Sequence, residues 1–475
     1  MFKLLAIGWC LCALVACGAR TDLAVEDPCS PTGDEVCDGI DNDCNGLVDD
    51  GIAPVQCGAA GCVTTVVCEG GVIPACVPRE PAAETCNLID DDCDGQVDEG
   101  FGFGPLGETV TLRTDEFDTG DCTSCRWAFG TSITPTEDGF LALWNLGLSG
   151  GAEEPNLYGR RLDSSGNLAG SIELLRSDLF LTIDPVLALE PKPPRGLPLD
   201  AIYRVGSDDV PGLLFVDSSG TTDAVLPTPA SGAYGVPRMV WTGARFVSAW
   251  EDDYKLRVAV LDANGVLEHE VKVDALERPA AITLGVYRDR VGILVSRYVD
   301  VPETRDQWFI LLDALGNVVQ PAHPIDVEYA SWQRLVGTEE GWLHIRPNGF
   351  GEPSTRQPLD PAGDPLDGAT TFEDGRHLSD SGGQDIFVPL VDQNETLAVW
   401  QSPEGGQMNV EFLDSRGQTR RHWSGPIPVL PGQEEDYLAD PHVAIAADRV
   451  VVLWHGGAPN NLPNRVMERS FGCVP

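Results

Sequence analysis

Two short acidic stretches of this chain concentrate the side chains that could bind a metal ion. Residues 37–51 read CDGIDNDCNGLVDDG, and residues 86–100 read CNLIDDDCDGQVDEG. Both contain the pattern D-x-D-x-[ND]-G-x-x-D, which starts four residues after the first cysteine. Carboxylates this dense repel one another, and a divalent cation removes that repulsion. The pattern therefore predicts two cation-binding loops; the alternative is a disulfide-held acidic turn without a specific ion.

The spacing is that of the first part of a calcium loop. In such a loop, side chains at positions 1, 3 and 5 converge on the ion, and a glycine at position 6 makes the turn. A backbone carbonyl at position 7 and an acid at position 9 complete most of the shell. The expected ligands are Asp41, Asp43, Asn45, Leu47 and Asp49 in the first copy, and Asp90, Asp92, Asp94, Gln96 and Asp98 in the second.

The loops depart from an EF-hand at position 12, where Ile52 and Phe101 replace the bidentate glutamate. The flanking sequence also lacks helical periodicity, so EF-hand pairs are not expected. With fewer charged ligands, we expect weak calcium affinity, on the order of 10⁻⁴ to 10⁻³ M. Asp38, Asp50, Glu99 or water would complete the shell.

The N-terminus predicts export. One cation, Lys3, precedes an apolar run that ends at Ala16 and is too short for a membrane-spanning helix. The sequence Leu14-Val15-Ala16-Cys17 resembles the lipobox of bacterial lipoproteins. This resemblance implies lipidation of Cys17 and an extracytoplasmic, membrane-anchored protein. By similarity to enterobacterial lipoprotein sorting, Gly18 in place of Asp favours the outer membrane or cell surface over the inner membrane. The net charge of −43 argues against nucleic acid as a partner.

The cysteines also indicate an oxidising compartment. Of fifteen, Cys10 and Cys12 leave with the signal and Cys17 takes lipid. The remaining twelve are Cys29, Cys37, Cys44, Cys57, Cys62, Cys68, Cys76, Cys86, Cys93, Cys122, Cys125 and Cys473. We expect a disulfide across each acidic loop, Cys37–Cys44 and Cys86–Cys93, and two more among Cys57, Cys62, Cys68 and Cys76.

Between the loops, GCVTTVVCEGGVIPACV predicts a small hairpin about Gly70-Gly71. Near the C-terminus, Cys473 is expected to bridge to Cys122 or Cys125 and so tie the last repeat to the first. The alternative is Cys122–Cys125, with Cys473 joined to Cys29.

The acidic stretches, extended to EVCDGIDNDCNGLVDDG and ETCNLIDDDCDGQVDEG, resemble the MopE-type metal-binding repeat, E-x-C-D-G-x-D-N-D-C-D-G-x-V-D-E-G. The second copy departs at Asn87-Leu88, where the repeat has Asp-Gly. The resemblance implies a metal-binding repeat of the kind found in secreted proteins and lipoproteins of myxobacteria. The family name is associated with copper, but these loops hold no His or Met, so we expect Ca²⁺, with copper as the alternative.

Residues 102–475 predict a β-propeller. An apolar strand end followed by D-x-x-G recurs at spacings of 45–54 residues. These tags carry Asp163, Asp217, Asp262, Asp313, Asp360 and Asp414. Short apolar strands precede most tags, such as those that end at Trp144, Trp250, Trp400 and Trp454. About seven units of about 50 residues, each with room for four strands, indicate a mostly β, seven-bladed propeller, with six or eight blades as alternatives.

The early strand GETVTLR, residues 107–113, is expected to complete the last blade and close the ring. The predicted domains are a signal peptide (1–16), a lipid-anchored linker (17–30), a disulfide-rich acidic module (31–101, with repeats at 34–51 and 84–100) and the propeller (102–475). The sequence shows no catalytic constellation, so we expect a calcium-binding stalk under a head that binds an unknown protein or glycan. The alternatives are an extracytoplasmic propeller hydrolase and a metal-scavenging protein.

Overall fold

The computed structural model describes residues 35–474 with gaps. In the acidic module the gaps fall at 41, 43–47, 50–51, 53–54, 59–61, 63, 95–96 and 99. The longer gaps beyond it are 115–125, 149–155, 182–186, 189–198, 226–237, 299–304, 328–332, 347–353, 372–384, 428–437 and 457–464. Every regular element of the described residues is a β-strand, and they include no helix that could cross a membrane.

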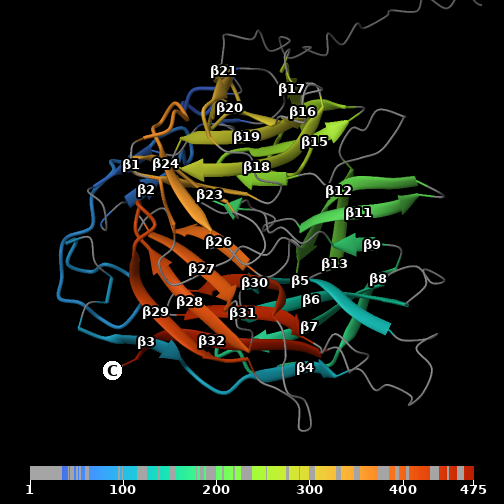
Figure 1. Cartoon of the computed structure of the whole chain (residues 1–475). Helices are drawn as coiled ribbons and strands as arrows, with labels where there is room; N and C mark the ends of the chain where they lie inside the picture. Colours follow the sequence, from blue (N-terminus) through green and yellow to red (C-terminus); the bar gives the residue numbers. More distant parts are fainter. Residues whose placement is uncertain are drawn as a thin grey trace, which may run out of the picture.

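Seven sheets of four or five strands make up the described part of residues 102–474 (Figure 1). The first sheet holds β5 (Arg126–Thr136), β6 (Gly139–Leu148), β7 (Asn156–Asp163) and β8 (Glu173–Ser177). The second holds β9 (Leu179–Leu181), β11 (Leu199–Val205), β12 (Asp208–Asp217) and β13 (Gly220–Val225). The third holds β10 (Leu187–Ala188), β14 (Arg238–Trp241), β15 (Phe246–Asp252), β16 (Lys255–Leu261) and β17 (Leu267–Val271).

The next sheets repeat this plan. The fourth holds β18 (Pro279–Tyr287), β19 (Arg290–Tyr298), β20 (Arg305–Asp313) and β21 (Val318–Ile325). The fifth holds β22 (Arg334–Thr338), β23 (Gly341–Arg346), β24 (Thr355–Leu359) and β25 (Thr370–Thr371). The sixth holds β26 (Asp385–Leu390), β27 (Glu395–Gln401), β28 (Gln407–Leu413) and β29 (Thr419–Pro426). The last holds β30 (Ala439–Ala446), β31 (Arg449–Gly456) and β32 (Arg465–Val474), together with β3 (Gly102–Pro105) and β4 (Val110–Thr114).

The sheets are arranged around a common centre, as the propeller prediction requires (Figure 1), and β9 of the second sheet contacts the first sheet. Apart from the short parallel strand β10, neighbouring strands within each sheet are antiparallel. Strand β14 contacts β18, β18 contacts β22, β22 contacts β26, and β26 contacts β30. Strand β30 of the last sheet in turn contacts β5 of the first. The described sheets thus surround a common axis as the blades of a propeller do.

The last sheet contains the ring closure, by which we mean the pairing of β3 and β4 with β32. Strand β4 pairs Val110 with Glu468, and β3 pairs Phe103 with Cys473. Two strands from the start of the propeller therefore occupy one edge of its last strand. The expectation that the segment around residues 107–113 completes the last blade is confirmed.

The D-x-x-G tags form hairpin turns. In five of the six, an aspartate carboxylate accepts hydrogen bonds from the backbone N–H groups two and four residues later. The turn after Asp217 lies outside the described residues. The turn glycines have positive φ, and a Cβ at Gly316 would lie 2.3 Å from Val260 of the neighbouring sheet. Glycine is thus required both by the backbone and by the close approach of adjacent sheets.

The tagged tryptophans pack in the core. Trp144, Trp250 and Trp454 have no exposed surface, and Trp400 is 5% exposed. They lie in clusters of hydrophobic side chains within and between the sheets. Their burial shows that the repeated tryptophans pack the blades.

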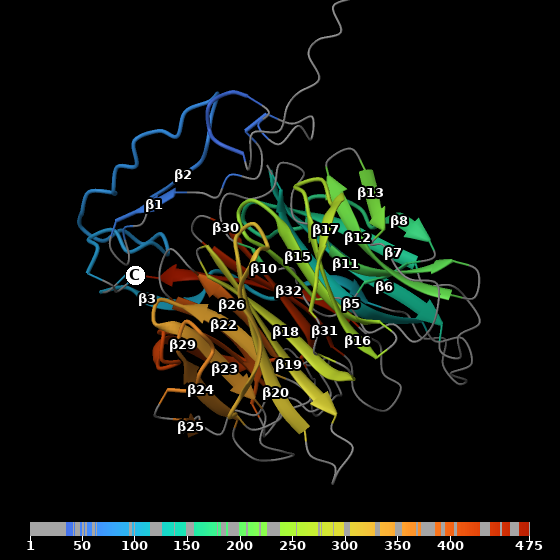
Figure 2. The same ribbon diagram turned by 90° about the horizontal axis from the view of Figure 1, so that it is seen from above.

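The acidic module lies along one side of the propeller, as Figures 1 and 2 show, and is held by disulfides. Its sheet pairs β1 (Val55–Cys57) with β2 (Thr64–Val66). The expected turn about Gly70-Gly71 is confirmed, with one antiparallel bridge between Glu69 and Val72. The longer strands expected on either side do not pair with each other, because β2 pairs with β1. Four disulfides are described, which are Cys37–Cys68, Cys57–Cys76, Cys62–Cys93 and Cys86–Cys473.

The predicted pairings Cys37–Cys44 and Cys86–Cys93 were therefore wrong. Cys93 has φ of 66° and its N–H is held by the Asp90 carboxylate, an orientation in which its sulfur bonds to Cys62. Of the four cysteines between the loops, only Cys57 and Cys76 pair with each other.

The expected partners of Cys473 were also wrong, since its sulfur bonds to Cys86. Cys473 is paired in register with Phe103, which brings it beside the end of the acidic module. Four other cysteines of the prediction, Cys29, Cys44, Cys122 and Cys125, lie outside the described residues.

Candidate metal site

The second acidic repeat brings three carboxylates together. One oxygen each of Glu84, Asp90 and Asp92 lie within 4.8 Å of one another. Asp90 is 1% exposed, whereas Glu84 and Asp92 are partly buried. Grouping carboxylates away from water is unfavourable unless a cation neutralises them. Three hard oxygen donors at this spacing fit a divalent cation such as calcium.

The backbone fixes two of these carboxylates. Asp90 accepts a hydrogen bond from the N–H of Cys93 at 2.6 Å, and Asp92 accepts one from the N–H of Asp94 at 3.0 Å. Both are turns in which an aspartate binds the backbone ahead of it. Asp90 and Asp92 were predicted as ligands, and they lie together; Asp94 is not in this group of three.

Glu84 is the member that we did not predict. Its carboxylate accepts hydrogen bonds from the N–H groups of Asp91 (2.6 Å), Asp92 (2.9 Å) and Asp98 (2.7 Å). A carboxylate has about four acceptor positions, so one is left for a cation. The signal was present, because the MopE-type pattern begins with a glutamate two residues before the first cysteine. Glu35 holds the same place in the first copy and accepts from the N–H of Asn42 at 2.6 Å.

The aspartates at position 9, Asp49 and Asp98, bind the backbone of their own loops. Asp98 accepts hydrogen bonds from the N–H groups of Asn87 and Leu88, at distances from 2.8 to 3.2 Å. Asp49 does the same for Asp38 and Gly39, at 2.8 to 3.1 Å. In both copies this carboxylate closes the loop onto the backbone eleven residues earlier, and Asp98 is not in the group of Glu84, Asp90 and Asp92.

The first repeat is described only in part. Its described group of Cys37, Asp49 and Cys68 does not fit a metal, because the two sulfurs form a disulfide and are not thiolates. The other predicted ligands Asp41, Asp43, Asn45, Leu47 and Gln96 lie outside the described residues, as does the lipidation residue Cys17.

The positively charged side chain of Arg79 lies beside the candidate site of the second repeat. An Arg79 side-chain N–H donates to the carbonyl of Asp90, and another Arg79 nitrogen is 4.0 Å from Asp91. Asp91 is otherwise bound to Thr85 and Asn87, and these hydrogen bonds, with Arg79, lower the pKa of its carboxyl. Asp91 therefore stays out of the group formed by Glu84, Asp90 and Asp92.

The second repeat is fastened to the propeller at three points. Cys86 is bonded to Cys473 of β32. Asp98 forms an ion pair of 3.4 Å with Arg421 of β29. Leu88 is 4% exposed and packs in a core cluster with side chains of the sixth and last sheets, among them Phe412.

Leu88 occupies a strained position. Its φ is 61°, and the matching residue of the first repeat is Gly39 with φ of 80°. A left-handed conformation costs a residue with a Cβ roughly 1–2 kcal/mol. Burying a leucine side chain contributes about 1.5–3 kcal/mol. The departure from the Asp-Gly of the repeat pattern is thus explained by the apolar contact that Leu88 makes with the propeller.

Arg421 lies between two buried carboxylates. It is 2.7 Å from Glu395 and 3.4 Å from Asp98, and its guanidinium lies 3.8 Å from the ring centre of Phe412. Burial raises the pKa of both carboxyl groups, and the charge of Arg421 opposes this rise. One cation therefore neutralises an acid of the module and an acid of the propeller together.

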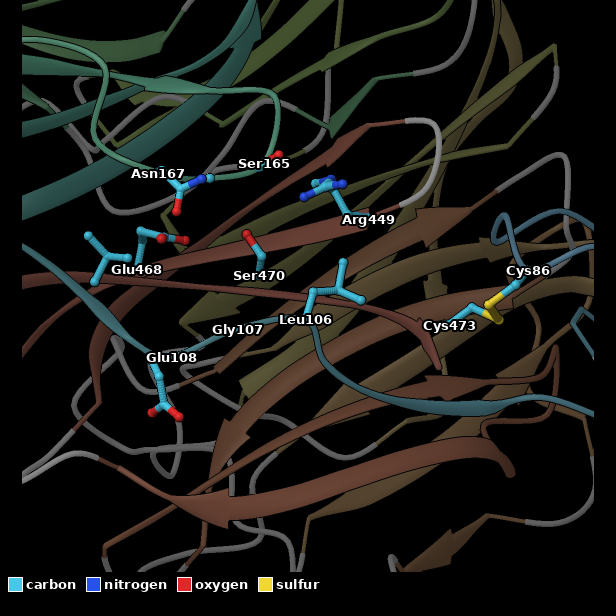
Figure 3. Close-up of a pocket in the computed structure, with 12 residues that line it drawn as sticks. Cys86, Leu106, Gly107, Glu108, Ser165, Asn167, Arg449, Glu468, Ser470 and Cys473 are labelled. Atoms are coloured by element: carbon cyan, nitrogen blue, oxygen red, sulfur yellow. A yellow bond between two sulfur atoms is a disulfide. The ribbon is translucent and has the colours of Figure 1, made fainter. Parts of the chain in front are cut away.

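A polar cavity of about 390 Å³ lies at the ring closure (Figure 3). Its lining includes Asn167, Arg449, Glu468 and the Cys86–Cys473 disulfide. Glu468 is 2% exposed, and burial raises its pKa to about 8, with the Asp163 carboxylate adding to the rise. Ser470 and Arg449 oppose that rise.

A second buried polar group joins the fourth and fifth sheets. Gln333 donates to Ser296 at 3.1 Å and is 2.9 Å from the ring of His344. Burial lowers the pKa of His344 to about 3. An imidazole with so low a pKa is a poor general base at neutral pH. This network fits a packing role between sheets.

Both acidic repeats match one family model. The model is Cu-binding MopE, described as a "Putative metal-binding motif", and it matches residues 28–50 and 79–99. Glu84, Asp90 and Asp92 all fall in the second matched stretch. The predicted resemblance to a MopE-type metal-binding repeat is confirmed.

Several solved structures are similar to this chain. The subtype N10 neuraminidase-like protein of A/little yellow-shouldered bat/Guatemala/060/2010 is 10% identical, with 78% of this chain and 99% of that chain covered and a TM-score of 0.35. The Dos1 propeller is 12% identical, with 77% and 95% covered and a TM-score of 0.41. The phage phi92 endosialidase is 8% identical, with 80% and 70% covered and a TM-score of 0.39. No curated protein matches the chain.

Proposed function

We propose that this protein is a membrane-anchored extracytoplasmic binding protein, with a calcium site in its second acidic repeat and a propeller that recognises a ligand. The observation that carries the metal assignment is the group of Glu84, Asp90 and Asp92 inside a matched metal-binding motif. Asp90 would supply the buried negative charge, and Glu84 would join the ion to the loop backbone. Weak affinity is expected, because only three described carboxylates contribute.

Calcium is favoured over copper by the chemistry of the donors. The described sulfurs of both repeats are in disulfides, so they are not soft thiolate ligands. All seven histidines of the chain lie at residue 269 or later, so neither repeat contains an imidazole. Carboxylate oxygens are the preferred ligands of hard cations.

Isothermal titration of the oxidised full-length protein with CaCl₂ and CuCl₂ tests this assignment. Asp90→Asn with Asp92→Asn should abolish one calcium-binding event. Asp91→Asn is the matched control, since Asp91 is bound to Thr85 and Asn87, and it should leave that event unchanged. Tight copper binding without a calcium response would support metal scavenging instead.

The anchor and the ligand of the propeller belong to the same proposal. Lipid on Cys17 would place the module next to the membrane and the propeller beyond it. Cys17→Ala should then release the protein from the membrane fraction or leave it unprocessed, and unchanged retention would contradict the anchor. We propose a protein or glycan ligand for the propeller and a binding role over catalysis.

A further inference from the structure

The two acidic repeats differ in how they relate to the propeller. Cys86, Leu88 and Asp98 of the second repeat each contact it, and we call these three residues the clasp. The matching residues of the first repeat, Cys37, Gly39 and Asp49, have their described partners within the module. Only the second repeat therefore has an attachment to the propeller among the described contacts of these positions.

The clasp is attached to the strands that form the ring closure. The chain leaves the second repeat at Gly100 and enters β3 at Gly102, and β3 pairs with β32. The Cys86–Cys473 bond ties the segment before β3 to β32 itself. The Asp98–Arg421 pair and Leu88 extend this attachment to the sixth sheet.

The clasp and the candidate ligands share one small loop. Glu84, through its carboxylate, accepts from the N–H groups of Asp91, Asp92 and Asp98. Asp98 in turn accepts from the N–H of Leu88 and pairs with Arg421. A single hydrogen-bond chain thus runs from a candidate ligand through the clasp to the propeller.

We propose that the second acidic repeat is a cation-dependent clasp that stabilises the closed propeller ring, a role that the described residues of the first repeat do not share. This inference rests on the proposed cation site of the second repeat. An ion that binds only the ordered loop stabilises every element folded together with it, by linkage. The coupling should therefore reach the propeller through Cys86, Leu88 and Asp98.

Tryptophan fluorescence gives a selective readout. Apart from Trp9, all tryptophans lie at residue 127 or later, so the signal reports on the propeller. Thermal unfolding of the oxidised full-length protein is followed with CaCl₂ or EDTA, and calcium binding is measured on the same samples by titration. With calcium at a hundredfold excess over its dissociation constant, we expect the propeller Tm to rise by about 3 °C.

The variants separate the two repeats. Glu84→Gln should remove the rise in Tm, and Asp92→Asn replaces it if Glu84→Gln disturbs folding. Glu35→Gln, the same change in the first repeat, should keep the rise. The triple variant Leu88→Gly, Cys86→Ser and Cys473→Ser should bind calcium but lose most of its effect on Tm, because only the Asp98–Arg421 pair of the clasp remains.

The outcomes distinguish the inference from the function on which it rests. Calcium binding without a change in propeller Tm would overturn the clasp and leave the cation site in place. Equal loss of the rise in Glu35→Gln and Glu84→Gln would overturn the difference between the repeats. Absence of calcium binding in the wild type would overturn both proposals.

Discussion

Asp98 of the acidic module and Arg421 of the propeller are 323 residues apart in the sequence, and their side chains form an ion pair of 3.4 Å. The same arginine binds Glu395 at 2.7 Å. Because Asp98 also holds the backbone of its own loop, this pair connects the metal-binding motif to the sixth sheet. The acidic module is therefore packed directly against the propeller and is not connected to it by the chain alone.

The first prediction concerns Arg421→Ala. This change leaves Asp98 and Glu395 buried without their cation, so we expect a loss of about 3 kcal/mol in the free energy of unfolding at pH 7. The pKa of both carboxyl groups is already raised by burial, so the native state takes up protons as the pH falls. At pH 5 the two carboxyl groups are more often protonated, so Arg421→Ala should lower the free energy of unfolding by less than at pH 7.

Urea unfolding at both pH values, followed by tryptophan fluorescence, measures this effect. Arg420→Ala is the control, since Arg420 is exposed and lies 3.9 Å from Asp414. A loss for Arg421→Ala no larger than that of Arg420→Ala at pH 7 would contradict the role of the ion pair.

The second prediction concerns Leu88, where we expect the glycine variant to be more stable than the alanine variant, the reverse of the usual order. At a buried leucine, truncation to alanine costs about 2–5 kcal/mol, and glycine usually costs more than alanine. At Leu88, glycine relieves the strain of a positive φ, and alanine does not. Leu88→Gly should therefore be more stable than Leu88→Ala by about 1 kcal/mol in denaturant unfolding. If the alanine variant is the more stable, Leu88 is not held in this conformation.

The third prediction concerns the disulfide at the ring closure. Cys86→Ser with Cys473→Ser opens a covalent loop with a sequence separation of 387 residues. In the loop-entropy model such a closure contributes up to ~6 kcal/mol, so the double variant should unfold at clearly lower denaturant. Cys57→Ser with Cys76→Ser, which opens a loop of only 19 residues inside the module, is the control. An equal effect of the two variants on the propeller fluorescence would argue against a special role for Cys86–Cys473.

The fourth prediction is a pH dependence set by Glu468. Burial raises the pKa of this group to about 8 in the native state, above its ordinary value of 4.5. The native state then binds the proton more tightly, so this stabilising contribution is complete below pH 4.5 and is lost as the pH rises through 8. Asp163 and Arg449 are the charged groups that act on it.

Glu468→Gln cannot ionise, so its free energy of unfolding should fall less than that of the wild type between pH 5 and pH 9. Chemical unfolding at these pH values checks the difference. Glu108→Gln, an exposed residue of the same cavity, is the control. If the free energy of unfolding of both variants depends equally weakly on pH, charge in the cavity, and not the burial of Glu468, sets the effect.

The propeller was predictable from sequence because its turns are local. Asp313 and Gly316 form their hydrogen bonds within four residues, so the D-x-x-G spacing contains the whole turn. The strands between such turns follow from their apolar runs. Residues 107–113 could be assigned to the last sheet because a ring must close with a strand from its other end.

The candidate site was predictable only in part. Asp90 and Asp92 follow from the spacing of the loop, but Glu84 approaches them from outside that spacing. Cys86 and Cys93 are seven residues apart, yet they face the propeller and Cys62 respectively. The spacing of cysteines in the sequence shows only which of them are close along the chain. Which of them pair depends on how distant segments pack against each other.

The most direct test of the account is the position of the ion itself. An anomalous difference map should be collected from crystals of the oxidised protein soaked in CaCl₂. We predict a peak at 2.3–2.6 Å from oxygens of Glu84, Asp90 and Asp92, the range typical of calcium. A map with peaks elsewhere but none among these three carboxylates would contradict the assignment of the second repeat as a cation site.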